Sequence, residues 1–430
     1  MARNGGPPPA SCCPLRCSKA TIRCLAHDAT VQLLRHVLLR LPSLTALARA
    51  AFTCRWMRRL VASDPEFRRL FRATHPPPLL GLFFDSPSPT IVPAIPSFVP
   101  ARRNDPDIAG AILAGDFFLT ALQVEPRVPP RWCAIDSRDG HLLLMNWANR
   151  MLAVLNPLAW QIEGYFDLNA LNFLDGADFV VTEGRLLCTD EHPSRFRIFC
   201  LVHDASRVQV VVFAHDDRDG VLLPSIAAPD RPDPEDDRLD WVENGTQAGE
   251  FIYWFYSNHE FVIILDTNTK NPRCYVQGVH PSLTLDEFES YVLGEDQRYT
   301  VDQVTGITRQ LPLVPYIVYA NGITISTLYG GMDGDLNGRW TATELIDLNS
   351  PGFPEIHHHH RELVALRDGI LYFATLRIRQ HHGNPSLFAS LDMERKKSRV
   401  LFLRTYDAGF QPYHMPWPRF LLGDYGVFAG

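Results

Sequence analysis

Apolar residues in the first part of the chain recur at the i, i+3, i+4 spacing of amphipathic helices. The spacing predicts a helix from Val31, which Pro42 must end because proline cannot continue it. Ser43 is a good N-cap for a second helix, and Asp64 for a last short one. The apolar positions of these helices are Leu33, Leu34, Val37, Leu38, Leu41, Leu44, Leu47, Ala48, Ala51, Trp56, Leu60, Val61, Phe67, Leu70 and Phe71.

The pattern changes after the stretch from His75 to Pro78, which stops helix formation. Short apolar or alternating runs now follow one another, separated by Asp-Gly, Asn-Gly and Pro turns, which is typical of antiparallel strands. A loose repeat of turn, strand, loop and strand recurs. Its turns are Asp139-Gly140, Glu183-Gly184, Gly249, Asn321-Gly322 and Asp368-Gly369.

The spacing of this repeat favours a β-propeller. Intervals of about 45 residues, such as those from Gly140 to Gly184 and from Gly322 to Gly369, suit one four-stranded blade. The wider intervals require insertions. Roughly 340 residues at about 45 per blade predict six to eight blades, and a large β-sandwich is the alternative. The expected fold class is therefore α plus all-β: three to four small helices followed by a large antiparallel β domain.

These patterns divide the chain into four parts. Residues 1–28 are expected to be a disordered leader, residues 29–73 a helical module, residues 74–104 a proline-rich junction and residues 105–430 the β domain. No apolar run reaches the ~18 residues of a membrane span. Nine scattered cysteines suit a reducing compartment. The first 27 residues lack acids, which leaves a transit peptide as an alternative to the leader.

Charge is distributed unevenly. The net charge of -7 combines thirteen Lys and Arg against three Asp and Glu in residues 1–72, a net charge of +10, with -17 for the remainder. A basic module on an acidic body can bind an acidic protein surface or nucleic acid. Few aromatic residues accompany these arginines, which argues against nucleic acid, and we expect neither a nucleic-acid nor a membrane partner.

Several segments could hold a metal, and each has a simpler interpretation. The stretch from Asp333 to Glu344 fits the D-x-[DN]-x-[DN]-G-x5-E calcium-loop pattern. An EF-hand needs flanking helices, whereas strand-like segments flank this loop, so a polar hairpin tip is the better interpretation. The histidines at 357–360 and 381–382, and the acidic stretch 216–240, are expected to be solvated loops. Cys12, Cys13, Cys17 and Cys24 lack the CxxC pairs of zinc sites. No metal or cofactor is predicted.

Catalytic motifs are missing from the sequence. It has no GxSxG elbow, GxxxxGK[ST] phosphate loop, HExxH or GxGxxG. The stretch Ser137–Gly140 misses the sialidase S-x-D-x-G-x-x-W box by one position. The aromatic residues Trp241, Tyr253, Trp254, Tyr256 and Trp417 could line a pocket, but in strands such residues more often form the core. No catalytic residue is predicted, and the chain is not expected to be an enzyme.

The helical module resembles the F-box, which docks a substrate receptor onto the Skp-type adaptor of a cullin–RING ubiquitin ligase. The matching features are LLRHVLLRLPS from Leu33 to Ser43, the alanine-rich segment after it, Cys54, and the RRLV…F ending from Arg58 to Phe67. The following stretch to Phe84, and Pro412–Pro418 near the C-terminus, resemble a group of grass F-box proteins with a propeller-like associated domain. Two features depart from the family: Ala29-Thr30 replace the opening Leu-Pro, and Trp56 lies one residue early.

The resemblance implies a function. Apolar residues of the first helices would grip the adaptor, and the β domain would hold an unknown target protein near the ligase, in the cytoplasm, the nucleus or both. The implied adaptor-binding residues are Leu34, Val37, Leu38, Leu41, Pro42, Leu44 and Trp56. The alternatives are an F-box descendant that no longer assembles a ligase, and a propeller-fold binding protein or glycan-processing enzyme without a ligase role.

Overall fold

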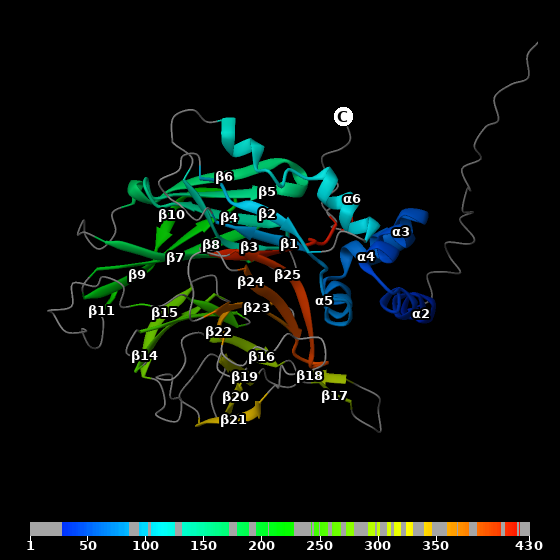
Figure 1. Cartoon of the computed structure of the whole chain (residues 1–430). Coiled ribbons are helices and arrows are strands. Elements are labelled where there is room, and N and C mark those ends of the chain that lie inside the picture. The colour runs from blue at the N-terminus through cyan, green and yellow to red at the C-terminus, as the bar shows by residue number, and fades with distance from the viewer. Residues whose placement is uncertain are drawn as a thin grey trace, which may run out of the picture. The chain divides into compact units, whose positions relative to one another are not determined.

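The chain forms two compact units, Met1–His75 with Pro418–Gly430, and Pro76–Trp417 (Figure 1). The structure is a computed structural model. Its described residues are 28–85, 94–101, 105–124, 131–171, 179–188, 195–227 except 205, 242, 245–256 except 249, 260–267, 272–278, the strands between 291 and 345 as backbone, and 359–421 except 368, 378–384, 406–408 and 419–420.

Four short helices build the first unit, α2 (Asp28–Leu39), α3 (Leu44–Thr53), α4 (Arg55–Ser63) and α5 (Pro65–Thr74). The two predicted caps are confirmed. The Ser43 side chain accepts a hydrogen bond from the Ala46 amide at 3.2 Å, and Asp64 accepts one from the Phe67 amide at 3.0 Å. Such bonds satisfy backbone N–H groups that a helix leaves unpaired in its first turn.

The helical unit has a small interior. The buried apolar side chains of its four helices are Leu38, Leu47, Ala51, Val61, Phe67 and Phe71. Arg35 of α2 forms ion pairs with Asp64, at 3.3 Å, and with Glu66, at 3.0 Å. These contacts link the first helix to the beginning of the last, so the unit is held by a few apolar side chains and a partly exposed ion pair.

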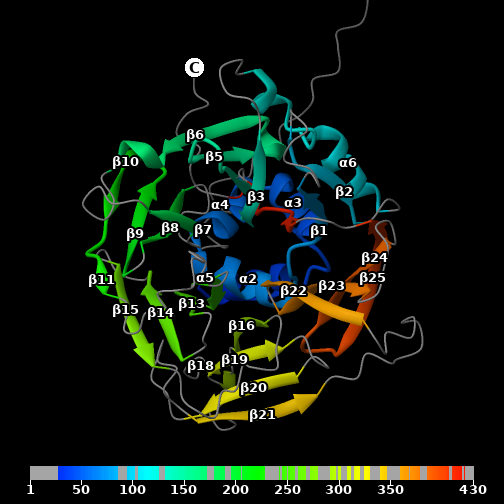
Figure 2. The same cartoon turned by 60° about the vertical axis from the view of Figure 1, so that its left-hand side comes forward.

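The second unit is a β-propeller with five four-stranded antiparallel blades (Figure 2). The first two blades are β3 (Trp132–Arg138), β4 (His141–Asn146), β5 (Met151–Asn156) and β6 (Gln161–Asp167), then β7 (Val180–Cys188), β8 (Phe196–His203), β9 (Arg207–Ala214) and β10 (Asp217–Leu222). The third blade contains β12 (Thr246–Ala248), β13 (Phe251–Phe255), β14 (Phe261–Asp266) and β15 (Arg273–Gly278).

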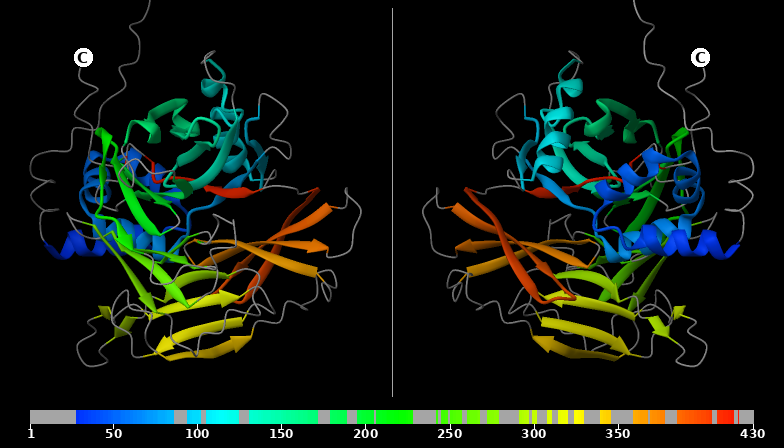
Figure 3. Two further views of the ribbon diagram at one scale, coloured as in Figure 1. Left: turned by 90° about the vertical axis from the view of Figure 1, so that its left-hand side faces the viewer. Right: turned by 90° about the vertical axis from the view of Figure 1, so that its right-hand side faces the viewer.

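The last two blades complete this series. They are β16 (Tyr291–Asp296), β19 (Val314–Tyr319), β20 (Thr324–Tyr329) and β21 (Arg339–Leu345), then β22 (His359–Arg367), β23 (Ile370–Arg377), β24 (Pro385–Asp392) and β25 (Lys397–Thr405). The yellow strands β19–β21 lie side by side in Figure 3. Additional elements are β11 (Ile226–Ala227), β17 (Tyr299–Val301), β18 (Thr308–Gln310), helix α6 (Pro106–Ala114) and the 3-10 turns η1 (Thr120–Val124), η2 (Pro157–Ala159) and η3 (Leu168–Ala170).

A three-stranded sheet joins the two ends of the propeller unit. In the order β2-β1-β26, strand β1 (Leu79–Phe84) pairs with both β2 (Ser97–Pro100) and β26 (Phe410–His414). Residues 79–100, expected to belong to a proline-rich junction, therefore contribute two strands to the propeller. Pairing the first strand of the unit with its last holds the ring of blades together without a free end.

The prediction of six to eight blades is wrong, since the propeller has five. That prediction assumed that the whole β region consists of blades, so the number of its residues was divided by the number in one blade. Part of that region instead forms α6, the three-stranded closing sheet and the extra hairpin β17–β18. The general prediction of helices followed by a β-propeller is confirmed, and the β-sandwich alternative is excluded.

One predicted turn marks a hairpin and another does not. Asp139 and Gly140 connect β3 to β4 with φ angles of 47° and 81°, the left-handed conformation that Asp-Gly hairpin turns require. Glu183-Gly184, in contrast, lies in the middle of strand β7. Apolar clusters fill the spaces between neighbouring blades, for example Leu143, Phe166 and Phe213 between the first and second. These clusters hold the inner strands at fixed positions around the central axis.

Candidate binding cavity in the propeller

The inner strands of the propeller surround a cavity of about 220 Å³. Its lining comes from β3, β7, β22 and the start of β26, together with residues at β12. The residues around it are Ala134, Ile135, Trp147, Thr182, Glu183, Arg185, Gly245, Thr246, Gln247, Leu363, Val364, Ala365, Leu366, Arg367, Gly409, Phe410 and Gln411. Strands from separate blades thus converge on one small space.

Three of these inner strands carry a register shift at the cavity. The pairing with the next strand skips Ile135 in β3, Thr182 in β7 and Val364 in β22. Each skipped residue lines the cavity. A β-bulge redirects the side chains that follow it, and bulges are enriched next to functional sites. The bulges therefore bring side chains to the cavity that regular alternation would point elsewhere.

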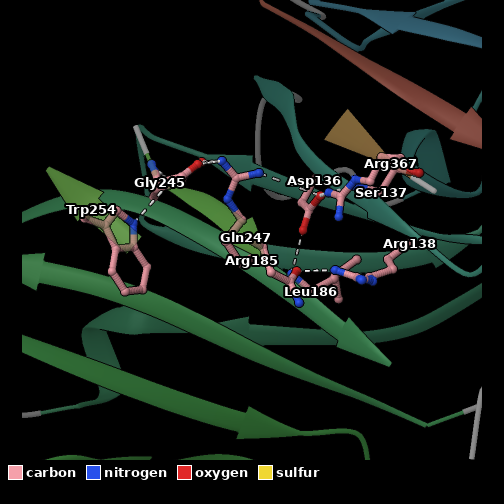
Figure 4. Close-up of polar contacts among 10 residues, drawn as sticks. Asp136, Ser137, Arg138, Arg185, Leu186, Gly245, Gln247, Trp254 and Arg367 are labelled. Atoms are coloured by element: carbon pink, nitrogen blue, oxygen red, sulfur yellow. Dashed lines mark hydrogen bonds and ion pairs between the residues drawn. The ribbon is translucent and has the colours of Figure 1, made fainter. Parts of the chain in front are cut away.

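Asp136 is the centre of a charged network beside the cavity (Figure 4). Its side chain is fully buried and accepts hydrogen bonds from the amides of Ser137 and Leu186, both at 2.8 Å. Arg367 donates to the same carboxylate, and Arg185 lies 4.0 Å from it. Burial alone would raise the pKa of Asp136, but the two arginines and the Leu186 amide outweigh it and lower the pKa.

Glu183 and Arg185 form a second buried ion pair around Gly245. Arg185 contacts the Glu183 carboxylate and donates to the Gly245 carbonyl. Glu183 also accepts hydrogen bonds from the Gly245 amide and, at 3.2 Å, from the Trp254 indole. Burial raises the pKa of Glu183 although Arg185 opposes it. A Cβ at Gly245 would lie 2.3 Å from the Trp254 indole nitrogen, so only glycine allows this close packing.

A third arginine completes the network. Arg138 donates a hydrogen bond to the side chain of Gln247, which lines the cavity. Among the described side chains of the network, three arginines therefore face two carboxylates. Asp136 lies behind the guanidinium groups, whereas Arg185 and Arg367 reach the cavity wall. With Glu183, which also lines the cavity, the wall has two arginines and one carboxylate.

The two carboxylates of the network differ in their access to the cavity, because Glu183 lines it and Asp136 does not. Both carboxylates already accept hydrogen bonds from arginine and backbone donors, and Asp136 does not reach the cavity surface. A general acid or base must contact the proton that it transfers. Within the described part of the chain, no group of three or more His, Cys, Asp or Glu side chains could hold a metal ion.

Two further ionisable groups lie close to the cavity. Asp85 accepts a hydrogen bond from the amide of Ala134, at 2.7 Å, and burial raises its pKa to about 7. His414 contacts the Tyr372 hydroxyl at 2.8 Å. Burial and the nearby Arg367 lower the pKa of His414 to about 3, so this imidazole is neutral at physiological pH and adds no charge to the site.

The residues predicted to bind an adaptor lie in different environments of the helical unit. Val37 and Pro42 are exposed. Leu34, Leu41, Leu44 and Trp56 are half-buried, and Leu38 is buried. Leu33 and Phe52 are also exposed, by 66% and 68%, and sequence reasoning did not select them. Leu33 and Val37 are four residues apart, which places them on one face of α2.

Exposed arginines lie close to these apolar residues in the sequence. Arg40, Arg49, Arg55 and Arg59 are all exposed on the helical unit. The surface of this unit thus combines large apolar groups with positive charge. Large apolar side chains on a surface mark interaction sites when they gather in a patch. Leu33 and Val37 are neighbours on the surface of α2 through their helical spacing.

The aromatic residues that could have lined a pocket belong to the core where they are described, as the simpler interpretation predicts. Tyr253, Trp254, Tyr256 and Trp417 are buried. Trp241, residues 1–27 of the predicted leader 1–28 and residues 330–338 of the calcium pattern lie outside the described residues, as do His357, His358, His381 and His382. Asp28, the last residue of that predicted leader, begins α2. The cysteines at 54, 133, 188, 200 and 274 are free thiols. No helix among the described residues is long and apolar enough to cross a membrane.

Comparisons with known proteins assign no family to the chain. No family model and no curated protein matches the sequence. Among solved structures, NirN, described as a dihydro-heme d1 dehydrogenase, matches over 77% of this chain and 75% of its own, with 12% identity and a TM-score of 0.31. AztD of Citrobacter koseri matches over 66% and 74%, with 11% identity and a TM-score of 0.30.

A third similar structure is the N-terminal domain of Nup159. It matches over 65% of this chain and 60% of its own length, with 8% identity and a TM-score of 0.27. The chain thus spans less than two thirds of that domain. At these identities and TM-scores, the similarity carries no argument.

Proposed function

We propose that this protein is a substrate receptor of a cullin–RING ubiquitin ligase. The helical unit would dock a Skp-type adaptor, and through it a cullin, while the propeller would hold a target protein. The chain itself would make and break no bonds, because holding the target near the ligase converts ubiquitin transfer into a proximity-driven step.

The observation that carries the proposal is the exposure of large apolar side chains on the helical unit. Leu33, Val37 and Phe52 are each more than half exposed, in a unit whose F-box-like sequence implies a partner at these helices. Burying such side chains against a partner is the main favourable term in most protein association. The exposed arginines of the unit would complement an acidic adaptor surface.

Val37→Asp tests the adaptor contact directly. Val37 is exposed, so the substitution spares the interior, whereas a change at the buried Leu38 would mainly test folding. We expect co-purification of the Skp-type adaptor to fall about tenfold or more, since hot-spot residues contribute at least that much to an interface. Leu113→Asp is the matched control, because Leu113 is an exposed leucine of the propeller unit. Undiminished adaptor binding by Val37→Asp would contradict the proposal.

If the chain does not assemble a ligase, the second candidate is a propeller-fold binding protein. The cationic cavity supports this alternative, because it does not depend on the helical unit. Tandem mass spectrometry of proteins captured with the full chain distinguishes the two. Adaptor and cullin peptides are expected for a ligase receptor, and their consistent absence from captures that do contain specific propeller-bound proteins favours the alternative.

A further inference from the structure

The propeller cavity has the properties of a constructed ligand site. Its wall combines strands of separate blades, and three bulges turn side chains toward it. Buried ion pairs at its side are costly to assemble, because each charge must leave water. Apolar side chains of similar volume would stabilise the propeller at least as well. The arrangement is therefore best explained by what it binds.

The charge of the wall indicates the chemistry of that ligand. With Asp136 and Glu183 ionised, the three arginines of the network leave one positive charge in excess among the described side chains. Arg185 and Arg367 line the cavity together with Glu183, which pairs with Arg185, while Asp136 is buried behind them. The wall itself therefore also has one positive charge in excess. The hydroxyl of Thr182 and the Nε of Arg185 are buried polar atoms without a hydrogen-bond partner among the described residues. An anionic group with one charge would balance this wall.

The size of the cavity limits what can enter. Pockets for whole small-molecule ligands usually measure about 300–1,000 Å³, whereas this cavity measures about 220 Å³. It suits one side chain or a very small acid. A carboxylate matches the planar guanidinium group, with which it forms paired charge-assisted hydrogen bonds.

We propose that the propeller recognises its target by an acidic side chain, whose carboxylate enters this cavity between Arg185 and Arg367. The inference rests on the proposed role of the propeller as the target-binding unit. It adds the chemical class of the ligand, an exposed Asp or Glu on the target. A free small carboxylic acid has the same chemistry, so the test must separate these two sources.

Gln411 offers a substitution that tests the cavity without breaking the buried ion pairs. Gln411 lines the cavity, and Gln411→Glu places a carboxylate beside the arginines with almost no change of volume. The new carboxylate would compete with the ligand. Gln411→Met is the neutral control of similar size. Gln161→Glu adds the same charge at an exposed position of β6, away from the cavity.

The experiment is calorimetric titration of the full chain at matched ionic strength. The probes are succinate, inorganic phosphate, the capped peptide Ac-Gly-Glu-Gly-NH2 and its Gln counterpart. We expect the Glu peptide to bind more tightly than the Gln peptide and phosphate. Gln411→Glu should weaken that binding about tenfold, as expected for the loss of a charge-assisted contact. Gln161→Glu should bind within about threefold of the wild type, and Gln411→Met should bind more tightly than Gln411→Glu.

Three outcomes would overturn the inference. They are equal binding of the Glu and Gln peptides, binding by Gln411→Glu as tight as by the wild type, and tighter binding of succinate or phosphate than of the Glu peptide. Circular dichroism of each variant verifies that the chain is folded, and Gln411→Glu and Gln411→Met must both pass. Adaptor co-purification separates the two proposals. Val37→Asp should keep the peptide affinity and lose adaptor binding. Gln411→Glu should keep adaptor binding and lose peptide affinity.

Discussion

The helical unit and the propeller use buried apolar residues in different ways. The four helices of the helical unit bury six apolar side chains and leave Leu33, Val37 and Phe52 exposed. The propeller fills the spaces between its blades with continuous apolar clusters and places charges beside its central cavity. One unit exposes apolar groups and the other buries ionic groups. Both arrangements make the unit less stable than a fully buried apolar interior would. In each unit they occur at the place where we expect it to bind.

Among the substitutions that test this difference between the two units, Phe67→Ala is expected to have the largest effect. Phe67 is fully buried in α5 and stacks on Phe71, with ring centroids 6.1 Å apart. Its truncation should cost about 3–5 kcal/mol, more than so small a unit can lose and remain folded. Hydrogen exchange by mass spectrometry should show loss of protection in peptides of α2–α5 alone.

Phe199→Ala is the matched substitution in the propeller, where Phe199 is also fully buried. The same loss of free energy should leave the propeller folded, because its apolar core is much larger. Protection of the α2–α5 peptides in Phe67→Ala at the wild-type level would show that the helical unit has more stability than its interior suggests.

Arg367→Leu should destabilise the propeller by about 3 kcal/mol, since it leaves the buried Asp136 with one of its two close arginines. Chemical denaturation followed by tryptophan fluorescence measures the change. Arg395→Leu removes an exposed arginine whose ion pair with Asp392 spans 3.9 Å, and should cost about 0–1 kcal/mol. Equal losses in the two variants would show that the buried network contributes no more than a surface pair.

Asp85 should make propeller stability depend on pH. Its pKa is raised to about 7 by burial, so the folded state binds a proton more tightly than the unfolded chain does. The stability associated with this proton is present below pH 4 and is lost as the pH rises toward 7. The slope is at most about 1.4 kcal/mol per pH unit. Asp85→Asn should remove that slope, whereas denaturation curves that shift equally with pH in both proteins would contradict the assignment.

The smallest expected effects concern the helix caps. Ser43→Ala should cost the helical unit about 1 kcal/mol. Asp64→Ala should cost about 1–2 kcal/mol, because Asp64 both caps α5 and pairs with Arg35. Thermal unfolding of the helical unit, monitored by hydrogen exchange, ranks the two variants by their stability. The reverse order would mean that the Arg35–Asp64 pair contributes nothing.

The chemistry of the cavity was not accessible from sequence patterns. Glu183-Gly184 has the composition of a turn, yet it lies inside β7. The bulges at Ile135, Thr182 and Val364 interrupt the alternation on which strand predictions depend. Asp136, Glu183 and Arg367 come from separate blades, up to 231 positions apart. Only the closure of the ring brings them together.

The sequence alone determined the local features of this protein. Proline and cap residues at 42, 43 and 64 define the helix boundaries, and Asp139-Gly140 defines a hairpin, because each acts on its own backbone within a few residues. The number of blades, the pairing of β1 with β26 and the charged cavity were decided by tertiary structure. They depend on which distant strands pack against one another, and burial between blades selects that arrangement for the chain as a whole.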